Sequence, residues 1–209
     1  LGQAAEYAAP HDVRASFEHR HRGHAGSKAM AIRFGRYDSA AIGPFTIALR
    51  DNAICRIMLG DEKACVAELR ARWPEARLIE DREPGSEYAA RISAYWDGAA
   101  QRLGNMPVQL RGTPFQLGVW RALLQIPMGT CVSYAAVARD VGRPGAGRAV
   151  GRAVAINPVA LLVPCHRVVK AGGAIGGYAG GAAHKERLLI LEAAITSARA
   201  RPYRVAENP

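Results

Sequence analysis

The chain has 209 residues, of which 49% are hydrophobic and 22% charged, a composition typical of a globular protein with one large or two small domains. It contains no apolar run long enough to span a membrane and no signal-peptide core, so we expect neither membrane insertion nor secretion. Residues 111–209 carry 13 Lys and Arg against 4 Asp and Glu, so this half supplies most of the net charge of +10 and indicates a polyanionic partner such as nucleic acid.

Residues 1–28 are polar and show no apolar periodicity, so we expect a flexible arm. Four of the six histidines lie here, namely His11, His19, His21 and His24. A metal site built from them is an alternative, but no surrounding apolar pattern would preorganise its ligands. We therefore favour a solvated arm and predict no metal site.

Residues 29–110 are predicted to form a scaffold domain, a small antiparallel sheet with helices. Strands are expected over 30–34, 45–49, 53–59 and 107–110, and helices over 61–72 and 87–98. Gly43-Pro44 and Asp51-Asn52 are typical turn pairs, and Asp61 is a candidate N-cap. We recognise no catalytic set in this domain.

A second domain is predicted over 111–196, followed by a tail over 197–209. Thr113-Pro114 with Gln116 matches a capping box with proline at the first helical position, and predicts a helix over 115–124. Ser133 is a good N-cap for a second helix over 134–141.

A third helix is predicted over 145–156, and it is built almost entirely from small residues such as Ala149. Two short helices, a glycine-bearing turn and this third helix are typical of a helix-turn-helix. Small side chains would allow close approach to a DNA groove, but tight helix packing needs them equally. Arg148 and Arg152, four residues apart on one face, favour the DNA interpretation.

The apolar run 159–163 leads into Pro164, Cys165 and His166, and the fixed φ of proline makes the backbone that enters Cys165 rigid. A thiolate is a strong nucleophile and a neighbouring base can activate it, although a buried structural cysteine is the commoner reason for such a pair. Cys165 is one of four scattered cysteines, with Cys55, Cys65 and Cys131, and no CxxC pair occurs. This usage indicates a reducing compartment, so we expect a cytoplasmic protein without a disulfide scaffold.

Several short segments occur in a characteristic order in the second half of the chain. They are Gly112-Thr113-Pro114-Phe115-Gln116, Val132-Ser133-Tyr134, Arg148-Ala149-Val150-Gly151, Asn157-Pro158, Pro164-Cys165-His166-Arg167-Val168, Gly177-Tyr178 and Lys185. Together they resemble the O6-alkylguanine-DNA alkyltransferases, including bacterial members of the Ada and Ogt type. The resemblance is dense over 111–195, looser over 29–110, and absent over 1–28.

The resemblance implies an irreversible transfer of an alkyl group from O6 of guanine to Cys165. His166 would accept the thiol proton through a water, and Glu192 would hold the other ring nitrogen and favour the imidazolium, as in a nucleophile, base and orienting-group relay. Asn157 would fix the hinge between the third helix and the active-site strand.

The resemblance also implies how duplex DNA is bound, with the target nucleotide flipped out through the minor groove. Arg148 would fill the vacated stack and Tyr134 would press on the phosphate 3′ to the target. Ser133, Ala149 and Arg152 complete the implied DNA-binding set. The implied substrate-binding residues are Tyr178 and Lys185, which support the base and its developing charge, together with Val163, Val168, Ala179 and Gly180.

The implied fold is α+β, with a ribonuclease H-like N-terminal domain and a helical, winged-helix-like C-terminal domain that binds DNA and carries the active site. The implied protein is a suicidal, single-turnover methyltransferase. It uses no cofactor, acts as a monomer on duplex DNA containing O6-alkylguanine, and extends to O4-alkylthymine; cooperative DNA binding stays open. Many bacterial relatives carry a bulky aromatic residue where this chain has Gly180, so we expect a roomier pocket.

Two other functions remain as alternatives. A DNA-binding regulator or damage sensor would recognise alkylguanine without repairing it, but relatives of that kind lack the acceptor thiol. A Cys-His hydrolase would need an oxyanion hole and turnover, and it would leave the basic third helix unexplained.

Overall fold

The computed structural model describes residues 7–8, 13–19, 30–60, 62–99, 103, 105–178, 180–198 and 204–205. The chain divides into two compact units, Leu1–Arg111 and Gly112–Pro209, and each is described by itself. Within the described residues, none of the helices has the length and apolar character needed to cross a membrane.

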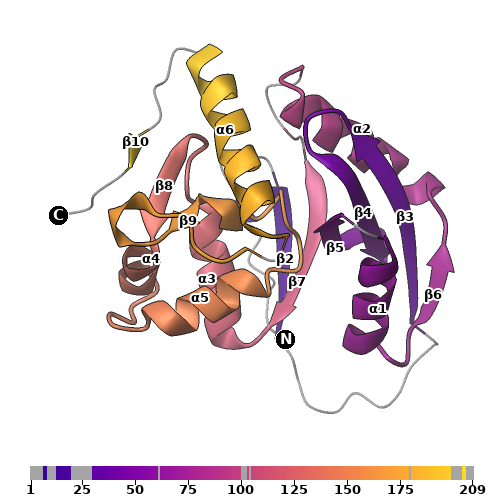
Figure 1. Ribbon diagram of the computed structural model, residues 1–209. Coiled ribbons are helices and arrows are strands. Elements are labelled where there is room, and N and C mark those ends of the chain that lie inside the picture. Colours follow the sequence, from indigo (N-terminus) through magenta and orange to yellow (C-terminus); the bar gives the residue numbers. More distant parts are fainter. Residues whose placement is uncertain are drawn as a thin grey trace. The chain divides into compact units, whose positions relative to one another are not determined.

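The first unit is built on one sheet with the strand order β1-β2-β7-β5-β4-β3-β6 (Figure 1). Its strands are β1 (Tyr7–Ala8), β2 (Val13–His19), β3 (Ala31–Ser39), β4 (Gly43–Arg50), β5 (Ala53–Leu59), β6 (Arg77–Glu80) and β7 (Met106–Gly112).

The centre of this sheet is the predicted meander of β3, β4 and β5, which pair antiparallel. Asp51 and Asn52 connect β4 to β5 and both have positive φ, 51° and 61°, the backbone that a two-residue hairpin turn requires. The prediction of a purely antiparallel sheet is wrong, because β6 pairs parallel to β3 and β7 pairs parallel to β5. Each of these two strands follows a helix, which provides the long crossover that parallel pairing needs.

Those two helices, α1 (Glu62–Arg72) and α2 (Glu83–Trp96), cover opposite faces of the sheet. On β3, Ile32 and Phe34 pack in one apolar cluster with α1, whereas the hydroxyl of Tyr37 donates to the Arg82 carbonyl just before α2. Because side chains alternate between the faces of a strand, these contacts place the two helices on different sides. Asp61, the candidate N-cap of α1, lies outside the described residues.

The expectation that residues 1–28 have no regular structure is wrong for residues 7–8 and 13–19, which form β1 and β2, and β2 lies beside β7. Val13 and Ala15 are buried and alternate with polar residues, a period-2 pattern that predicts a half-buried strand. Glu18 accepts a hydrogen bond from buried Arg50 at 2.6 Å, which ties β2 to the sheet. His11, His21 and His24 lie outside the described residues.

The second unit contains α3 (Pro114–Leu124), α4 (Tyr134–Asp140), α5 (Gly147–Ala155) and α6 (Ala182–Ala198). Short strands β8 (Thr130–Ser133) and β9 (Val168–Val169) pair parallel, and β10 (Arg204–Val205), in the segment predicted to be a tail, pairs with the other edge of β8. The 3-10 turns η1 (Cys165–Arg167) and η2 (Ala171–Gly173) flank β9.

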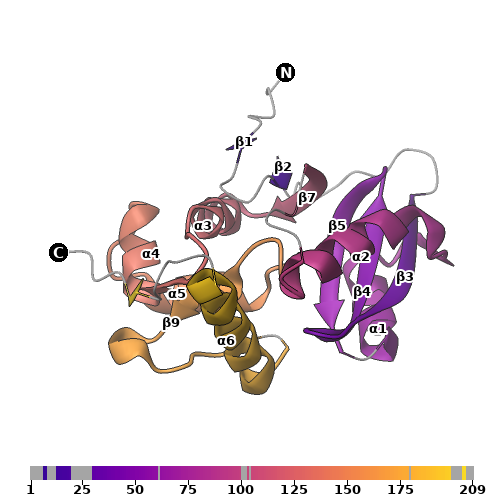
Figure 2. The same ribbon diagram turned by 90° about the horizontal axis from the view of Figure 1, so that it is seen from above.

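The helix starts of this unit follow the predicted local rules. Thr113 and Gln116 form the reciprocal capping box of α3, and the Ser133 hydroxyl accepts the Ala136 N–H at the start of α4. Helices α3, α4 and α5 pack against one another, and α6 packs against η1 (Figures 1 and 2). The indole of buried Trp120 donates to the Ala153 carbonyl at 3.0 Å, which fixes α5 on α3.

Candidate functional site

The loop between α5 and Cys165 is organised by the side chain of Asn157. Its Oδ1 accepts the Val159 N–H at 3.1 Å, and its Nδ2 donates to the Val163 carbonyl at 2.8 Å. Leu161 has a φ of 71° within this loop, a left-handed conformation that is strained for a branched residue. One buried amide therefore holds both ends of a tight turn.

The chain enters Cys165 through a compact turn. Pro164 has φ −79° and ψ 62°, and the Cys165 N–H donates back to the Val163 carbonyl at 2.7 Å, the geometry of an inverse γ-turn. Cys165 then begins η1. Proline favours this arrangement because its ring fixes φ near the required value and it needs no hydrogen-bond partner for nitrogen.

The Cys165 thiol is buried and surrounded by polar groups. Asn157 Nδ2 donates to Sγ at 3.0 Å, a contact that stabilises negative charge on sulfur. The hydroxyl of Tyr178 is buried close to Cys165, and burial followed by the negative charge of a Cys165 thiolate raises the pKa of Tyr178 well above 10. Tyr178 therefore stays protonated and able to donate.

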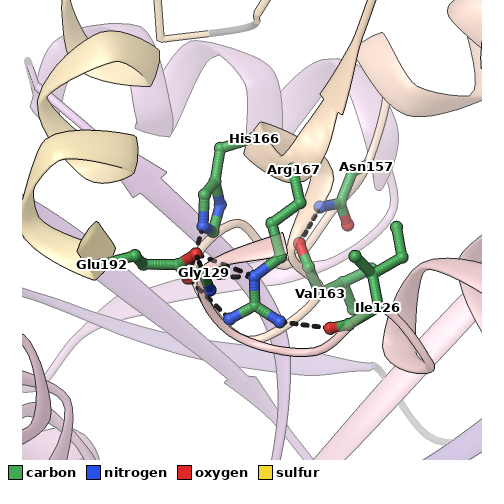
Figure 3. Close-up of polar contacts among 7 residues, drawn as sticks. All are labelled: Ile126, Gly129, Asn157, Val163, His166, Arg167 and Glu192. Atoms are coloured by element: carbon green, nitrogen blue, oxygen red, sulfur yellow. Dashed lines mark hydrogen bonds and ion pairs between the residues drawn. The ribbon is translucent and has the colours of Figure 1, made fainter. Parts of the chain in front are cut away.

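His166 and Glu192 form a buried pair on the other side of η1 (Figure 3). His166 Nε2 lies 2.9 Å from Glu192 Oε1, and both side chains are fully buried. Glu192 reaches this position from α6, and its Oε2 also accepts the Gly129 N–H at 3.3 Å. The structure thus brings the predicted base and its orienting carboxylate into direct contact.

Arg167 is a member of this network for which the sequence analysis assigned no role. Its Nε and Nη2 donate to Glu192 at 3.0 and 2.6 Å, and its Nη1 donates to the Ile126 carbonyl (Figure 3). The sequence contains one signal for such a role, because Arg167 is followed by the apolar pair Val168-Val169 and an arginine in a buried segment is rarely unpaired.

The protonation states of the pair follow from these contacts. Burial raises the pKa of Glu192, but the charges of His166 and Arg167 and their hydrogen bonds outweigh it and hold the pKa well below its usual range. Burial lowers the pKa of His166, and Glu192 opposes this only in part. Glu192 favours the imidazolium, as expected, but burial outweighs this effect, so the neutral ring of His166 is favoured in the resting protein.

Lys185, expected to support the leaving base, is buried close to the thiol. Its Nζ donates to the Val168 carbonyl and lies 5.9 Å from the centre of the Tyr134 ring. Burial lowers the pKa of Lys185, whereas the nearby sulfurs of Cys165 and Cys131 favour its charge. Lys185 thus connects β9 to the first residue of α4, next to the thiol.

Tyr134 and the predicted helix α5 form the outer part of the site. The Tyr134 ring lies against the backbone of Gly176, where any side chain would clash with it, and its hydroxyl lies 3.5 Å from the Gly177 carbonyl. On α5, Val150, Ala153 and Val154 face the core, while Arg148 and Arg152 are exposed and Ala149 is half-buried. One face of this helix therefore packs against the core, and the other face presents two arginines among small side chains to solvent.

The remaining predicted substrate residues line the same region. Gly180 lies against Tyr178, and a Cβ at this position would lie 3.1 Å from the Tyr178 ring. Val168 is buried beside η1, and Ala179 lies outside the described residues. In the part of the chain that the structure describes, we find no cluster of three His, Cys, Asp or Glu side chains able to hold a metal.

Comparison with known proteins decides the family. Residues 114–194 match the family described as 6-O-methylguanine DNA methyltransferase, DNA binding domain. The inducible methylated-DNA–protein-cysteine methyltransferase of Bacillus subtilis is 41% identical over 140 residues, which cover 65% of this chain and 78% of that protein. The chain belongs to the methylated-DNA–protein-cysteine methyltransferase family.

Two further relatives of this methyltransferase family extend the comparison. The crystal structure of Mycobacterium tuberculosis OGT in complex with DNA is 36% identical with a TM-score of 0.66, and the match covers 78% of this chain and 94% of that one. The bifunctional transcriptional activator and DNA repair enzyme Ada of Escherichia coli is 36% identical over 80% of this chain but only 47% of its own length. The mixed fold of this methyltransferase matches the OGT structure.

The residues matched by the methyltransferase DNA-binding profile include the whole network around Cys165, from Asn157 to Glu192. The same stretch includes Tyr134 and α5. All described site residues therefore belong to the second unit of this methyltransferase. The first unit contributes none of the predicted residues.

Proposed function

We propose that this methyltransferase repairs duplex DNA by moving the alkyl group of O6-alkylguanine to Cys165 in one irreversible step. The observation that carries the proposal is the buried thiol that accepts a hydrogen bond from Asn157 and adjoins a His166–Glu192 pair. The DNA complex of the Mycobacterium tuberculosis relative supports DNA as the partner.

The chemical step is an in-line displacement at the alkyl carbon. The S–C bond forms as the C–O6 bond breaks, and the electron pair of that bond returns to the base. His166 accepts the thiol proton through a water, and the proton ends on the released guanine. The products are unmodified guanine and a thioether at Cys165, so each molecule acts once and needs no cofactor.

Selectivity for guanine depends on the Val163 carbonyl, which already accepts hydrogen bonds within the protein. The Val163 carbonyl accepts from Asn157 Nδ2 and from the Cys165 N–H, which fills both of its lone pairs. The exocyclic amine of a flipped guanine must therefore share or replace one of these donors. Tyr178, protonated beside the sulfur, is the side chain we assign as donor to the base.

We propose that the target nucleotide is flipped through the minor groove, onto which α5 docks. The exposed Arg148 enters the stack in place of the base, while Arg152 and Ala149 contact the groove. Tyr134 and Ser133, at the start of α4, contact the backbone 3′ to the target, where helix N-termini favour phosphate. Lys185 and the backbone of Gly176 both lie against the Tyr134 ring, and these contacts would keep the ring in place against the phosphate.

Arg148→Ala is expected to slow transfer on duplex DNA roughly tenfold, because opening a base pair costs a few kcal/mol that the inserted side chain offsets. Transfer to the free base should change little. Rapid-quench rates on both substrates test this, with Arg143→Ala as a control for losing one exposed arginine. Equal rates for Arg148→Ala and the parent protein on duplex DNA would rule out the flipping role.

The pocket beside Gly180 is proposed to admit alkyl groups larger than methyl. Gly180→Trp is expected to reduce transfer from O6-benzylguanine at least tenfold more than transfer from O6-methylguanine, because even its Cβ would press on the Tyr178 ring at 3.1 Å. The measurement is the ratio of the transfer rates for the two substrates. A folding defect would slow both substrates equally and would leave this ratio unchanged. A parent protein that fails to react with the benzyl adduct would contradict the proposal.

Finer points of the same proposal concern substrate range, assembly and fold. We extend the substrate range to O4-alkylthymine and expect a monomer on DNA. We assign the first unit as a ribonuclease H-like scaffold and α3 to α5 as a winged-helix-like reader. The alternating helices and parallel strands of the first unit and the packed helices beside paired β8 and β9 support this assignment.

The competing function is a damage sensor that binds alkylguanine without repairing it. Incubating a limiting amount of protein with excess O6-methylguanine duplex separates the possibilities. Our proposal predicts that repair stops at one base per protein molecule. Tight binding without loss of methylguanine would indicate the sensor, and continued turnover would indicate a hydrolytic enzyme.

A further inference from the structure

The buried carboxylate of Glu192 is shared between the guanidinium of Arg167 and the imidazole ring of His166. Arg167 Nε lies 3.0 Å from both carboxylate oxygens and Nη2 donates to Oε1 at 2.6 Å, so the guanidinium contacts both oxygens. His166 Nε2 contacts Oε1 at 2.9 Å. All three side chains are almost completely inaccessible to water. The paired guanidinium geometry matches a carboxylate far better than a single imidazole contact does.

The charges around His166 can be assigned group by group. Helix α6 brings Glu192 and Lys185, and η1 brings Arg167, the charged groups that act on His166. Cys165 of η1 and Cys131 of β8 act on Lys185. Arginine stays protonated in proteins, so Arg167 and Glu192 form a neutral ion pair. A proton on His166 would then add an uncompensated charge in a buried site that already holds Lys185.

We propose that Arg167 is a positioning residue that neutralises Glu192 and so keeps His166 a neutral base with its proton on Nε2 and its accepting lone pair on Nδ1. This inference rests on the proposed function for the identity of the proton donor, Cys165. Burial and the charge of Arg167 both lower the pKa of His166, in agreement with the geometry.

The pairing of Arg167 with Glu192 determines whether His166 can accept the thiol proton and then release it. The thiol proton passes from Sγ to Nδ1 as the S–C bond forms, and it must leave again for the guanine. Arg167 makes the imidazolium a short-lived species, because it removes most of the charge with which Glu192 would hold it. Without Arg167, the full charge of Glu192 would face His166 and raise its pKa, so fewer molecules would hold a neutral ring able to accept the proton.

The parent protein gives a first test that needs no variant. In a sample labelled with 15N in its histidine rings, the His166 nitrogens should report a neutral ring protonated on Nε2 at pH values down to well below 6.5. A ring that gains charge near pH 6.5 or above, or that carries its proton on Nδ1, would overturn the proposal. Because DNA is absent, this result stands whether or not the protein transfers alkyl groups.

Two substitutions separate the charge of Arg167 from its packing. Arg167→Met should raise the pH at which His166 titrates by about 1–3 units, the range that a nearby charge produces, and should move the acid limb of the transfer rate upward equally. Arg167→Lys keeps the charge and should leave both nearly unchanged, and Arg187→Met controls for losing an exposed charge on α6. Equal effects of Met and Lys would assign Arg167 a packing role only.

The outcomes also distinguish this inference from the proposed function. If Arg167→Met fails to fold, as judged by circular dichroism, Arg167→Gln replaces it in the same titration, because glutamine removes the charge but can still donate a hydrogen bond to Glu192. If the parent protein binds alkylated DNA but transfers nothing, the proposed function fails while the titration still tests Arg167.

Discussion

Replacing Cys165 with serine is expected to abolish alkyl transfer while DNA binding stays unchanged. A serine hydroxyl is a weak nucleophile at neutral pH because its pKa is far above that of a thiol, so it stays protonated where a cysteine can form a thiolate. The proposed DNA-binding surface of α4 and α5 lies outside η1, so this change of one atom should not alter it.

The measurement is single-turnover transfer from an O6-methylguanine duplex, combined with a gel-shift titration on the same DNA. Cys131→Ala is the matched control, since Cys131 is a second buried thiol in the same unit. It should retain transfer. If Cys165→Ser transferred the alkyl group at a rate comparable to that of the parent protein, another residue would have to be the acceptor.

Replacing Glu192 with glutamine is expected to produce the largest loss of stability. The substitution keeps the shape of the side chain but leaves the Arg167 charge buried without its counter-charge, and breaking a buried ion pair from one side costs about 3–5 kcal/mol. That is a large share of the 5–15 kcal/mol that stabilises a typical domain. Transfer should also slow, because His166 loses the group that orients it.

Denaturant unfolding of the two variants Glu192→Gln and Glu186→Gln tests this expectation. Glu186 is exposed on the same helix, so its substitution should change stability little. A Glu192→Gln protein as stable as the Glu186→Gln control would show that the buried network is not needed for folding.

The same network predicts how stability depends on pH. The pKa of His166 is lower in the folded protein than in the unfolded chain, so protons bind the unfolded chain first and stability falls as pH drops below about 6.5. The pKa of Glu192 is also lowered on folding, so its contribution is present above about pH 4.3 and is lost at lower pH. In Glu192→Gln, this second loss should disappear.

The parts of the fold that depend on local residue chemistry could be predicted from the sequence. The capping box of Thr113, the Ser133 cap and the Asp51-Asn52 turn each involve groups within a few residues, and the structure confirms them. The parallel strands could not be predicted, because β6 is short and half-exposed and its pairing with β3 depends on a helical crossover. Strand β2 was missed although Val13 and Ala15 alternate with polar residues.

In the candidate site, too, the residues could be predicted from local motifs, but their long-range contacts could not. The Cys165, His166 and Asn157 set was found through ordered motifs, and the structure brings these residues together. The inverse γ-turn at Pro164 and the left-handed Leu161 depend on the Asn157 side chain, which no local pattern reveals. The direction of Lys185 and the sharing of Glu192 with Arg167 depend on burial, which decides where long charged side chains find partners.

The central claim is that Cys165 accepts the alkyl group once and keeps it. Intact-protein mass spectrometry after reaction with a slight excess of O6-methylguanine duplex, followed by peptide mapping, tests it most directly. We predict a complete shift by the mass of one CH2 group, located on Cys165 and absent from Cys55, Cys65 and Cys131. An unshifted mass while methylguanine disappears from the DNA, or a methyl group mapped to another residue, would contradict the account.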